Sequence, residues 1–216
     1  MITIPSSGLT KGSWVSFDFK LSDFTGLTNK SNLGQIVVVS DATIQDVLID
    51  NMYFYEIPTT PTVAAPTPTL AASNVISMFS DAYTDVVVDT WRTGWSAADF
   101  QDVTIAGNAT KEYNNLNFVG IETTSSTIDA SAMTHIHLDV WSANFSSFSI
   151  KLVDFGADGA FGGGDDVEHQ LDFANPNTGS WISYDIPLTD FTGLTTKSNM
   201  AQYILVAQPS GAAKVY

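Results

Sequence analysis

The sequence contains no cysteine and only eight lysine and arginine residues among 216. Without cysteine the chain has no disulfides, no thiolate metal ligands and no thiol nucleophile. The basic residues face 23 acidic ones, which gives a formal net charge of −15. This balance argues against nucleic acid or an anionic membrane as a partner, because both require Lys or Arg to neutralise phosphates.

Long apolar runs and helical periodicity are also missing. No stretch approaches the roughly 20 apolar residues of a membrane span, and the first residues lack the basic and apolar regions of a signal peptide. Instead, short segments that alternate apolar and polar residues are separated by Gly, Asn, Asp and Ser. This pattern predicts an all-β fold, an antiparallel β-sandwich.

One stretch of the chain occurs twice. Residues 12–39 and 179–206 are identical at 17 of 28 positions with a constant offset of 167. We interpret residues 1–56 as the C-terminal half of a preceding module, residues 57–72 as a semi-rigid Pro/Thr linker, and residues 73–216 as a second module. The expected strands are 13–19, 35–39, 47–55, 75–79, 110–118, 135–141, 148–154, 168–173, 181–186 and 203–207.

The strand expected at 47–55 follows the first copy of the repeat and has no counterpart after the second copy. A sandwich that lacks a strand exposes unpaired edges. Residues 46–56 therefore offer a means of self-association, by completing the second module of the same chain or of another chain.

Four segments of the second module, residues 75–83, 114–118, 128–139 and 179–188, resemble jelly-roll carbohydrate-binding modules. The resemblance is to modules appended to secreted bacterial glycoside hydrolases, especially laminarinase-like family 16 enzymes, and residues 49–55 match their closing strand. It implies a jelly roll that is secreted or at the bacterial cell surface and binds a β-glucan or another neutral polysaccharide. It also implies a cation site that pairs Asp81 with a carboxylate of the closing strand, a role that Asp50 fills in the first copy.

The segment 135–141 carries the sharpest pattern for sugar binding. His137, Asp139 and Trp141 alternate with apolar residues, so they share the face that the core leaves free. An aromatic ring with polar neighbours suits a pyranose. We expect neighbouring strands to add Tyr113, Asn115, Asn117, Lys151 and Trp181. The alternative is a merely polar outer sheet whose aromatic residues close the edge of the sandwich.

A second candidate is the loop-like segment that carries Trp91, Arg92 and Trp95. Exposed aromatic residues on a loop are costly unless they meet a partner, and Arg can hydrogen-bond hydroxyl groups in a fixed fork. The alternative is that both tryptophans cover an open end of the core.

A Gly-rich stretch carries five carboxylates, those of Asp154, Asp158, Asp165, Asp166 and Glu168. Flexible backbone lets several oxygens converge, and Ca²⁺ takes six to eight oxygen ligands. We therefore expect a structural calcium ion here, the alternative being a solvated acidic hairpin.

Catalysis is the weaker hypothesis. Paired carboxylates serve glycosidases, but the acidic residues gather in one flexible loop, and no Gly-x-Ser-x-Gly motif is present. We expect non-catalytic polysaccharide binding that targets a parent enzyme or adhesin. The alternative function is a structural repeat of a surface adhesin or fibre.

Overall fold

A computed structural model describes residues 1–40 and 46–216 of the chain, which divide into two compact units, Met1–Tyr53 and Phe54–Tyr216. The second unit contains a short 3₁₀ helix, η3 (Ala72–Asn74), and all of the named strands. These are β1 (Ala97–Ile105), β2 (Asn108–Glu122), β3 (His135–Trp141), β4 (Ser147–Asp154), β5 (Val167–Ala174), β6 (Trp181–Pro187), β7 (Met200–Gln208) and β8 (Ala213–Val215).

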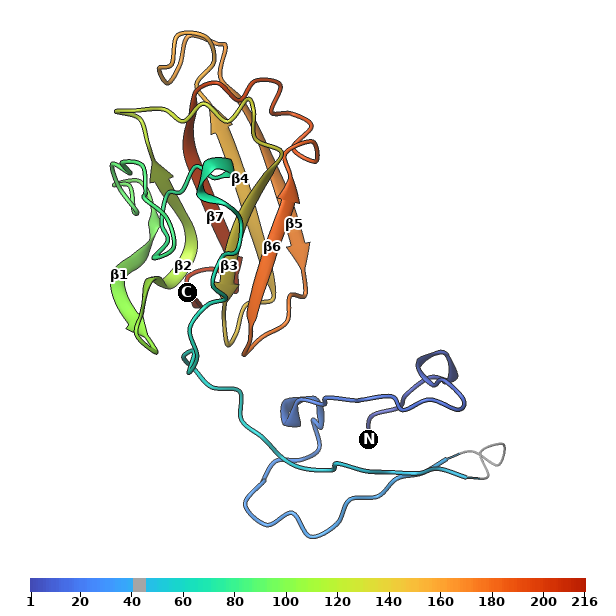
Figure 1. Cartoon of the computed structure of the whole chain (residues 1–216). Coiled ribbons are helices and arrows are strands. Elements are labelled where there is room, and N and C mark those ends of the chain that lie inside the picture. The colour runs from blue at the N-terminus through green and yellow to red at the C-terminus, as the bar shows by residue number, and fades with distance from the viewer. Residues whose placement is uncertain (41–45) are drawn as a thin grey trace. The chain divides into compact units, whose positions relative to one another are not determined.

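The strands form two sheets (Figure 1). The larger sheet has the order β1-β2-β7-β4-β5, with β8 paired to β2, and the smaller sheet consists of β3 and β6. Every strand pair is antiparallel. The chain passes from β2 to β3, back to β4, and again from β5 through β6 to β7, so successive strands cross between the sheets. The prediction of an antiparallel jelly-roll sandwich is confirmed.

Apolar side chains on the facing sides of the two sheets form the core. On β4, Phe148, Ile150 and Leu152 alternate with outward-facing residues, and all three are buried. Tyr184 of β6 meets them from the smaller sheet, with its ring centroid 5.5 Å from that of Phe148. Burying each such side chain stabilises the fold by about 1.5–3 kcal/mol.

The strand β1, which forms a hairpin with β2, was not predicted from the sequence pattern. Both turn residues, Ala106 and Gly107, have positive φ (50° and 91°), as a type I′ turn requires. The usual signal for that turn is Asn-Gly or Asp-Gly, which is absent here, and only Ala98 of β1 is buried. The short strand β8, which pairs with β2, was also not predicted.

The first unit contains two 3₁₀ helices, η1 (Ser6–Gly8) and η2 (Leu21–Asp23), and no strand among its described residues. The strands expected at 13–19, 35–39 and 47–55 are therefore not formed in this structure. Strands need neighbours to pair their N–H and C=O groups, and isolated ones are marginal in water. Strand exchange through residues 46–56 stays a prediction.

The strand expected at 75–79 is also not formed. This segment makes only an isolated bridge, between Ser77 and Asp85. Among the described residues, no helix is long and apolar enough to cross a membrane.

Candidate functional site

The outer face of the larger sheet presents a row of residues from four strands. Cross-strand register aligns Gly120 on β2 with Ile204 on β7, then with Lys151 on β4 and Gln170 on β5. Their neighbours Val119, Leu205 and Ile150 point into the core, so this row points away from it. The row is apolar near β7 and polar toward β5.

Trp95 lies at one end of this row, directly on the backbone of Gly120. A Cβ atom added to Gly120 would stand 2.0 Å from a carbon of the Trp95 ring, so only glycine fits beneath it. The ring stacks on Phe118, with 6.2 Å between centroids and 19° between planes. Gly120 anchors the loop from both sides, because its N–H donates to Ser96 Oγ (3.0 Å) and its carbonyl accepts from the Thr93 N–H (3.0 Å).

A cavity of about 720 Å³ opens beside Trp95. Phe161 also lines this cavity, with its ring centroid 5.7 Å from that of Phe155. Trp95 is 44% exposed and Phe161 76% exposed, which leaves both rings accessible. Glu122 and Gln202 line the same cavity, and Gln202 Nε2 donates a 2.9 Å hydrogen bond to Glu122 Oε1. The remaining lining residues are Thr124, Gly159 and Ala160.

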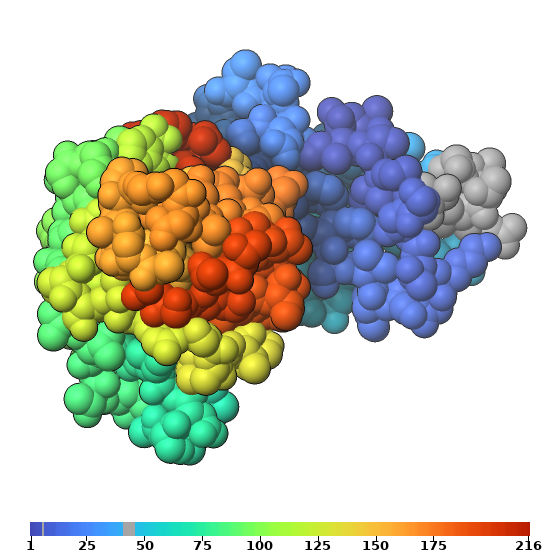
Figure 2. Space-filling model, turned by 90° about the horizontal axis from the view of Figure 1, so that it is seen from above, coloured from blue at the N-terminus to red at the C-terminus, as the bar shows by residue number. Residues whose placement is uncertain are grey.

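The loop that carries Phe161 is held by its own carboxylates. Asp154 is fully buried and accepts hydrogen bonds from the Thr196 hydroxyl (2.7 Å) and the Asn199 N–H (2.7 Å). Asp165 accepts from the Ala157 N–H (2.7 Å). Asp158 and Asp166 likewise accept from the backbone N–H groups of Ala160 (2.9 Å) and Gly162 (2.8 Å). Figure 2 looks onto this end of the sandwich and shows the loop in orange.

This arrangement differs from a converging cation site. Glu168 pairs with Lys151 across the sheet, at 2.5 Å between Lys151 Nζ and Glu168 Oε1. Asp81 is exposed. Within residues 1–40 and 46–216, no group of three or more His, Asp or Glu residues is placed to hold a metal ion. Calcium binding at these carboxylates stays a prediction.

The outer face of the smaller sheet carries a polar network. His137 Nδ1 lies 2.7 Å from Asp185 Oδ1, and its Nε2 lies 3.4 Å from Asp139 Oδ2. Ser183 donates to Asp139 (2.6 Å). Partial burial lowers the pKa of His137, but the hydrogen bonds and charges of Asp185 and Asp139 outweigh it and raise the pKa above its usual value.

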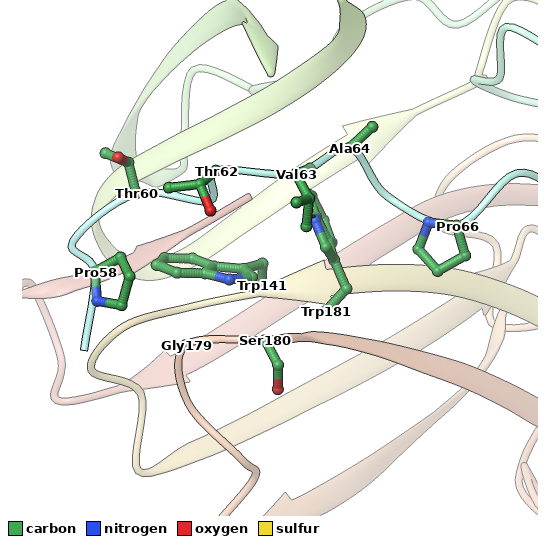
Figure 3. A pocket seen from close by; sticks show the side chains of 10 residues that line it. All are labelled: Pro58, Thr60, Thr62, Val63, Ala64, Pro66, Trp141, Gly179, Ser180 and Trp181. Atoms are coloured by element: carbon green, nitrogen blue, oxygen red, sulfur yellow. Dashed lines mark hydrogen bonds between the residues drawn. The ribbon is translucent and has the colours of Figure 1, made fainter. Parts of the chain in front are cut away.

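Trp141 shares this face but is not the exposed platform that its alternation predicts. It lies opposite Trp181 in the register of β3 and β6 and is only 2% exposed. Tyr216 packs against its edge at 5.5 Å, and residues between 58 and 66 cover it (Figure 3).

The residues expected to join Trp141 from neighbouring strands are divided between the sheets. Trp181 does pair with it, but Tyr113, Asn115 and Lys151 belong to the larger sheet. The expectation of one shared face is wrong, because β2 and β4 lie across the core from β3. Alternation along a strand shows which side chains share a face, but it does not show which strands are neighbours.

Of the candidates Trp91, Arg92 and Trp95, only Trp95 lines the cavity. Trp91 packs on the core and beside Phe79, and Lys111 Nζ lies 4.8 Å from the centre of its ring. Arg92 Nε donates to the carbonyl of Ala98 (2.6 Å). Trp91 and Arg92 therefore have structural contacts that account for them.

Two further candidates on β2 also have structural partners. Tyr113 is buried, and its hydroxyl donates to the Trp91 carbonyl (2.9 Å). Asn115 has a positive φ of 51° at the bulge of β2, and its amide donates to Asp99 (2.7 Å). The outer-face residues that sequence reasoning missed are Phe118, Glu122, Phe161 and Gln202. Phe161 could have been noticed as an aromatic residue in a Gly-rich loop. The five carboxylates of the same stretch favoured a cation site instead.

Three solved structures of carbohydrate-binding modules are similar to this chain. A family 30 module of a cellulosomal cellulase of Clostridium thermocellum is 16% identical, with a TM-score of 0.47 over 59% of this chain and 87% of that one. A family 11 module from the same organism, in complex with a β-1,3-1,4-mixed-linked tetrasaccharide, is 15% identical, with a TM-score of 0.39 over 58% and 82%. A module of Cellvibrio mixtus lichenase 5A, in complex with cellotriose, is 15% identical, with a TM-score of 0.31 over 57% and 86%. No family model and no curated protein matches the chain.

Proposed function

We propose that this protein binds a neutral polysaccharide, without catalysis, on the outer face of the larger sheet. The observation that carries the proposal is that two accessible rings, those of Trp95 and Phe161, line one cavity together with Glu122 and Gln202. Sugar rings have an apolar C–H face and a rim of hydroxyl groups. Aromatic walls suit the first, and a carboxylate with an adjacent amide suits the second.

The charge and shape of the site favour a neutral chain over a small or anionic ligand. The net charge of −15 repels anionic polymers, and Lys151 on this face is already paired with Glu168. From the cavity, the row of Ile204, Lys151 and Gln170 continues across the sheet. A polymer that begins in the cavity would have a surface along which to extend.

The parent of such a module would be a secreted or cell-surface protein. We propose that it is a polysaccharide-degrading enzyme, for which a laminarinase-like enzyme is the specific candidate, or an adhesin. Binding would keep the parent on its insoluble substrate.

Affinity electrophoresis of the full chain in gels containing laminarin, xylan, mannan or agarose tests the proposal. We expect retardation on at least one glycan. Trp95→Ala should weaken binding about thirtyfold, which corresponds to the loss of about 2 kcal/mol typical of a central aromatic anchor. Phe161→Ala should weaken it about tenfold, because that ring is more exposed. Trp14→Ala, a change at an exposed tryptophan of the first unit, is the matched control.

A second pair of variants tests the geometry without removing an aromatic residue. Gly120→Ala should displace the Trp95 ring and weaken binding as much as Trp95→Ala, whereas Gly94→Ala should have no effect, because its Cβ would meet no atom within 4 Å. If no glycan retards the chain, the binding function is wrong and the structural-repeat alternative gains support. If a glycan binds but the Trp95 and Phe161 variants bind equally well, the site lies elsewhere.

A further inference from the structure

The Pro/Thr segment is seated on the outer face of the smaller sheet. Residues 54–72 belong to the same compact unit as the sandwich. The Trp181 indole Nε1–H donates a 2.9 Å hydrogen bond to the Val63 carbonyl. Figure 3 shows the segment crossing Trp141 and Trp181, with a cavity of about 350 Å³ bounded by both rings and by residues from Pro58 to Pro66. Pro61 is buried within the segment.

The surface beneath the segment has a backbone suited to this close approach. Gly179 has a φ of 77°, and a Cβ added to it would stand 2.6 Å from Ile57 Cγ2. A side chain at position 179 would therefore displace the start of the segment. The Gly179 N–H donates to the Ser142 carbonyl (2.8 Å), which fixes this turn beside Trp141.

The composition of the segment also favours docking. Prolines 58, 61 and 66 fix φ and remove N–H donors, so the segment loses less conformational freedom on binding than an ordinary chain. The carbonyl groups of the segment remain free to accept hydrogen bonds. A tryptophan suits such a segment, because its ring is apolar and its indole N–H can donate to a carbonyl. Aromatic-lined surfaces are the usual recognition sites for Pro-rich segments.

We propose that the outer face of the smaller sheet at Trp141, Trp181 and Gly179 is a recognition site for the chain's own residues 57–66. This segment is then a strap held in a defined place, and the chain continues from Thr67 to the 3₁₀ helix η3 (Ala72–Asn74). The two outer faces have separate tasks, because the strap occupies the aromatic pair of the smaller sheet and the glycan would take that of the larger sheet. The residues that line the strap cavity and those that line the glycan site do not overlap.

Elastase cleavage of the full chain tests the strap. Elastase cuts after small residues, so residues 63–65 are its sites within the strap and residues 70–72 are reference sites outside it. In the wild type we expect cleavage at 63–65 to be slower than at 70–72. Trp181→Phe, which removes the hydrogen-bond donor and keeps a ring, should speed cleavage at 63–65 about fivefold, or about 1 kcal/mol at 1.4 kcal/mol per tenfold. Trp181→Ala should speed it more, whereas Trp95→Phe and Trp95→Ala should leave it at the wild-type rate.

A second measurement separates strap release from unfolding. Gly179→Ala should also release the strap, whereas Gly12→Ala, at the equivalent glycine of the first copy, should not, since its Cβ would meet no atom within 4 Å. Near-ultraviolet circular dichroism of each variant reports whether the sandwich core remains. In the wild type, the Trp181 indole N–H should exchange with solvent at least tenfold more slowly than that of exposed Trp14.

Two results would overturn the strap. One is cleavage at 63–65 as fast as at 70–72 in the wild type, with no change in Trp181→Phe or Trp181→Ala. The other is equal exchange of the two indole N–H groups. Neither result bears on glycan binding, because retardation in gels depends on Trp95 and Phe161. A failed strap and a failed glycan site are therefore distinguishable.

Discussion

The two copies of the repeat share 17 of 28 residues but have different structures. In the second copy, residues beginning at Trp181 form β6, which pairs with β3 along its whole length. In the first copy, the equivalent residues form no strand within the described part of the chain, and Val15, Phe17 and Phe19 are exposed. The difference teaches that alternation gives a segment the capacity to become a strand, while a partner strand and an apolar face to cover decide whether it does.

What the two copies share is local backbone geometry. Gly12 and Gly179 occupy equivalent positions and have φ values of 76° and 77°. Each copy also turns at its Leu-Ser/Thr-Asp segment, as the 3₁₀ helix η2 (Leu21–Asp23) in the first and as a turn at residues 188–190 in the second. Turn conformations are encoded within a few residues, whereas strand pairing depends on residues far away in the sequence.

The largest expected contrast between the copies concerns an identical phenylalanine. Phe191 is 1% exposed in the core of the sandwich, whereas its equivalent Phe24 is only half-buried, against Phe19. Phe191→Ala should lower the free energy of unfolding of the sandwich by about 4 kcal/mol, through lost burial and the cavity left behind. Phe24→Ala should change it by less than about 0.5 kcal/mol. Urea denaturation followed by near-ultraviolet circular dichroism measures both. Equal losses would show that the first copy is also packed into a core.

A glycine pair gives the next contrast. A Cβ on Gly193 would stand 2.7 Å from the Glu168 carbonyl oxygen and 2.9 Å from His169 Nδ1, which accepts the Gly193 N–H at 2.8 Å. Gly193→Ala should therefore cost about 2 kcal/mol of stability, by overpacking and by weakening that hydrogen bond. The equivalent Gly26→Ala meets no atom within 4 Å and should be neutral within about 0.5 kcal/mol in the same denaturation series. A neutral Gly193→Ala would contradict the close packing of this turn against β5.

The smallest contrast concerns pH. All three histidines lie in the second unit, and the pKa of His137 is raised in the fold by Asp185 and Asp139. Its contribution to stability is therefore complete below the unfolded value of about 6.5 and is lost as the pH rises through the raised value. The sandwich should be slightly more stable near pH 6 than near pH 8 from this source, by a few tenths of a kcal/mol because His137 is substantially exposed.

His137→Gln isolates that contribution. In this variant, the free energy of unfolding should no longer differ between pH 6 and pH 8 from this source. Urea titrations at both pH values measure it. His135→Gln is the matched control, because that histidine lies on the same face of β3. An unchanged pH dependence in His137→Gln would place its origin in other groups.

The sequence predicted most of the sandwich because its strands alternate and turn residues separate them. The segments around Phe148 and Tyr184 follow that rule, and both form strands whose ends lie within one residue of the predicted limits. The pattern failed where tertiary context decides. The segment 75–79 has strand composition but makes only a single bridge. In contrast, β1 is mostly exposed and still pairs, because the turn at Ala106 and Gly107 brings β2 back alongside it.

The candidate site was predicted less well than the fold. Trp95 was identified as an exposed loop aromatic, and its exposure agrees with that interpretation. Its contact with Gly120 could not be inferred, because the two residues lie 25 positions apart and nothing local links them. For Trp141, the position on an outer face was inferred correctly, but its burial was not. The segment that covers it lies about 80 residues earlier in the sequence.

The position of the strap has a mechanical consequence. Tension from residues before Ile57 reaches the sandwich first at Gly179 and then at Trp181, at the end of the smaller sheet where β3 is joined to the larger sheet. There the backbones of Trp141 and Tyr216 exchange two hydrogen bonds, of 3.1 Å and 2.9 Å, and Ser142 Oγ donates to the Lys214 carbonyl (2.6 Å). A force applied at this end of the smaller sheet is therefore shared by both sheets. It acts on these hydrogen bonds and on the core together, and it does not separate β3 and β6 from the larger sheet starting at their free end.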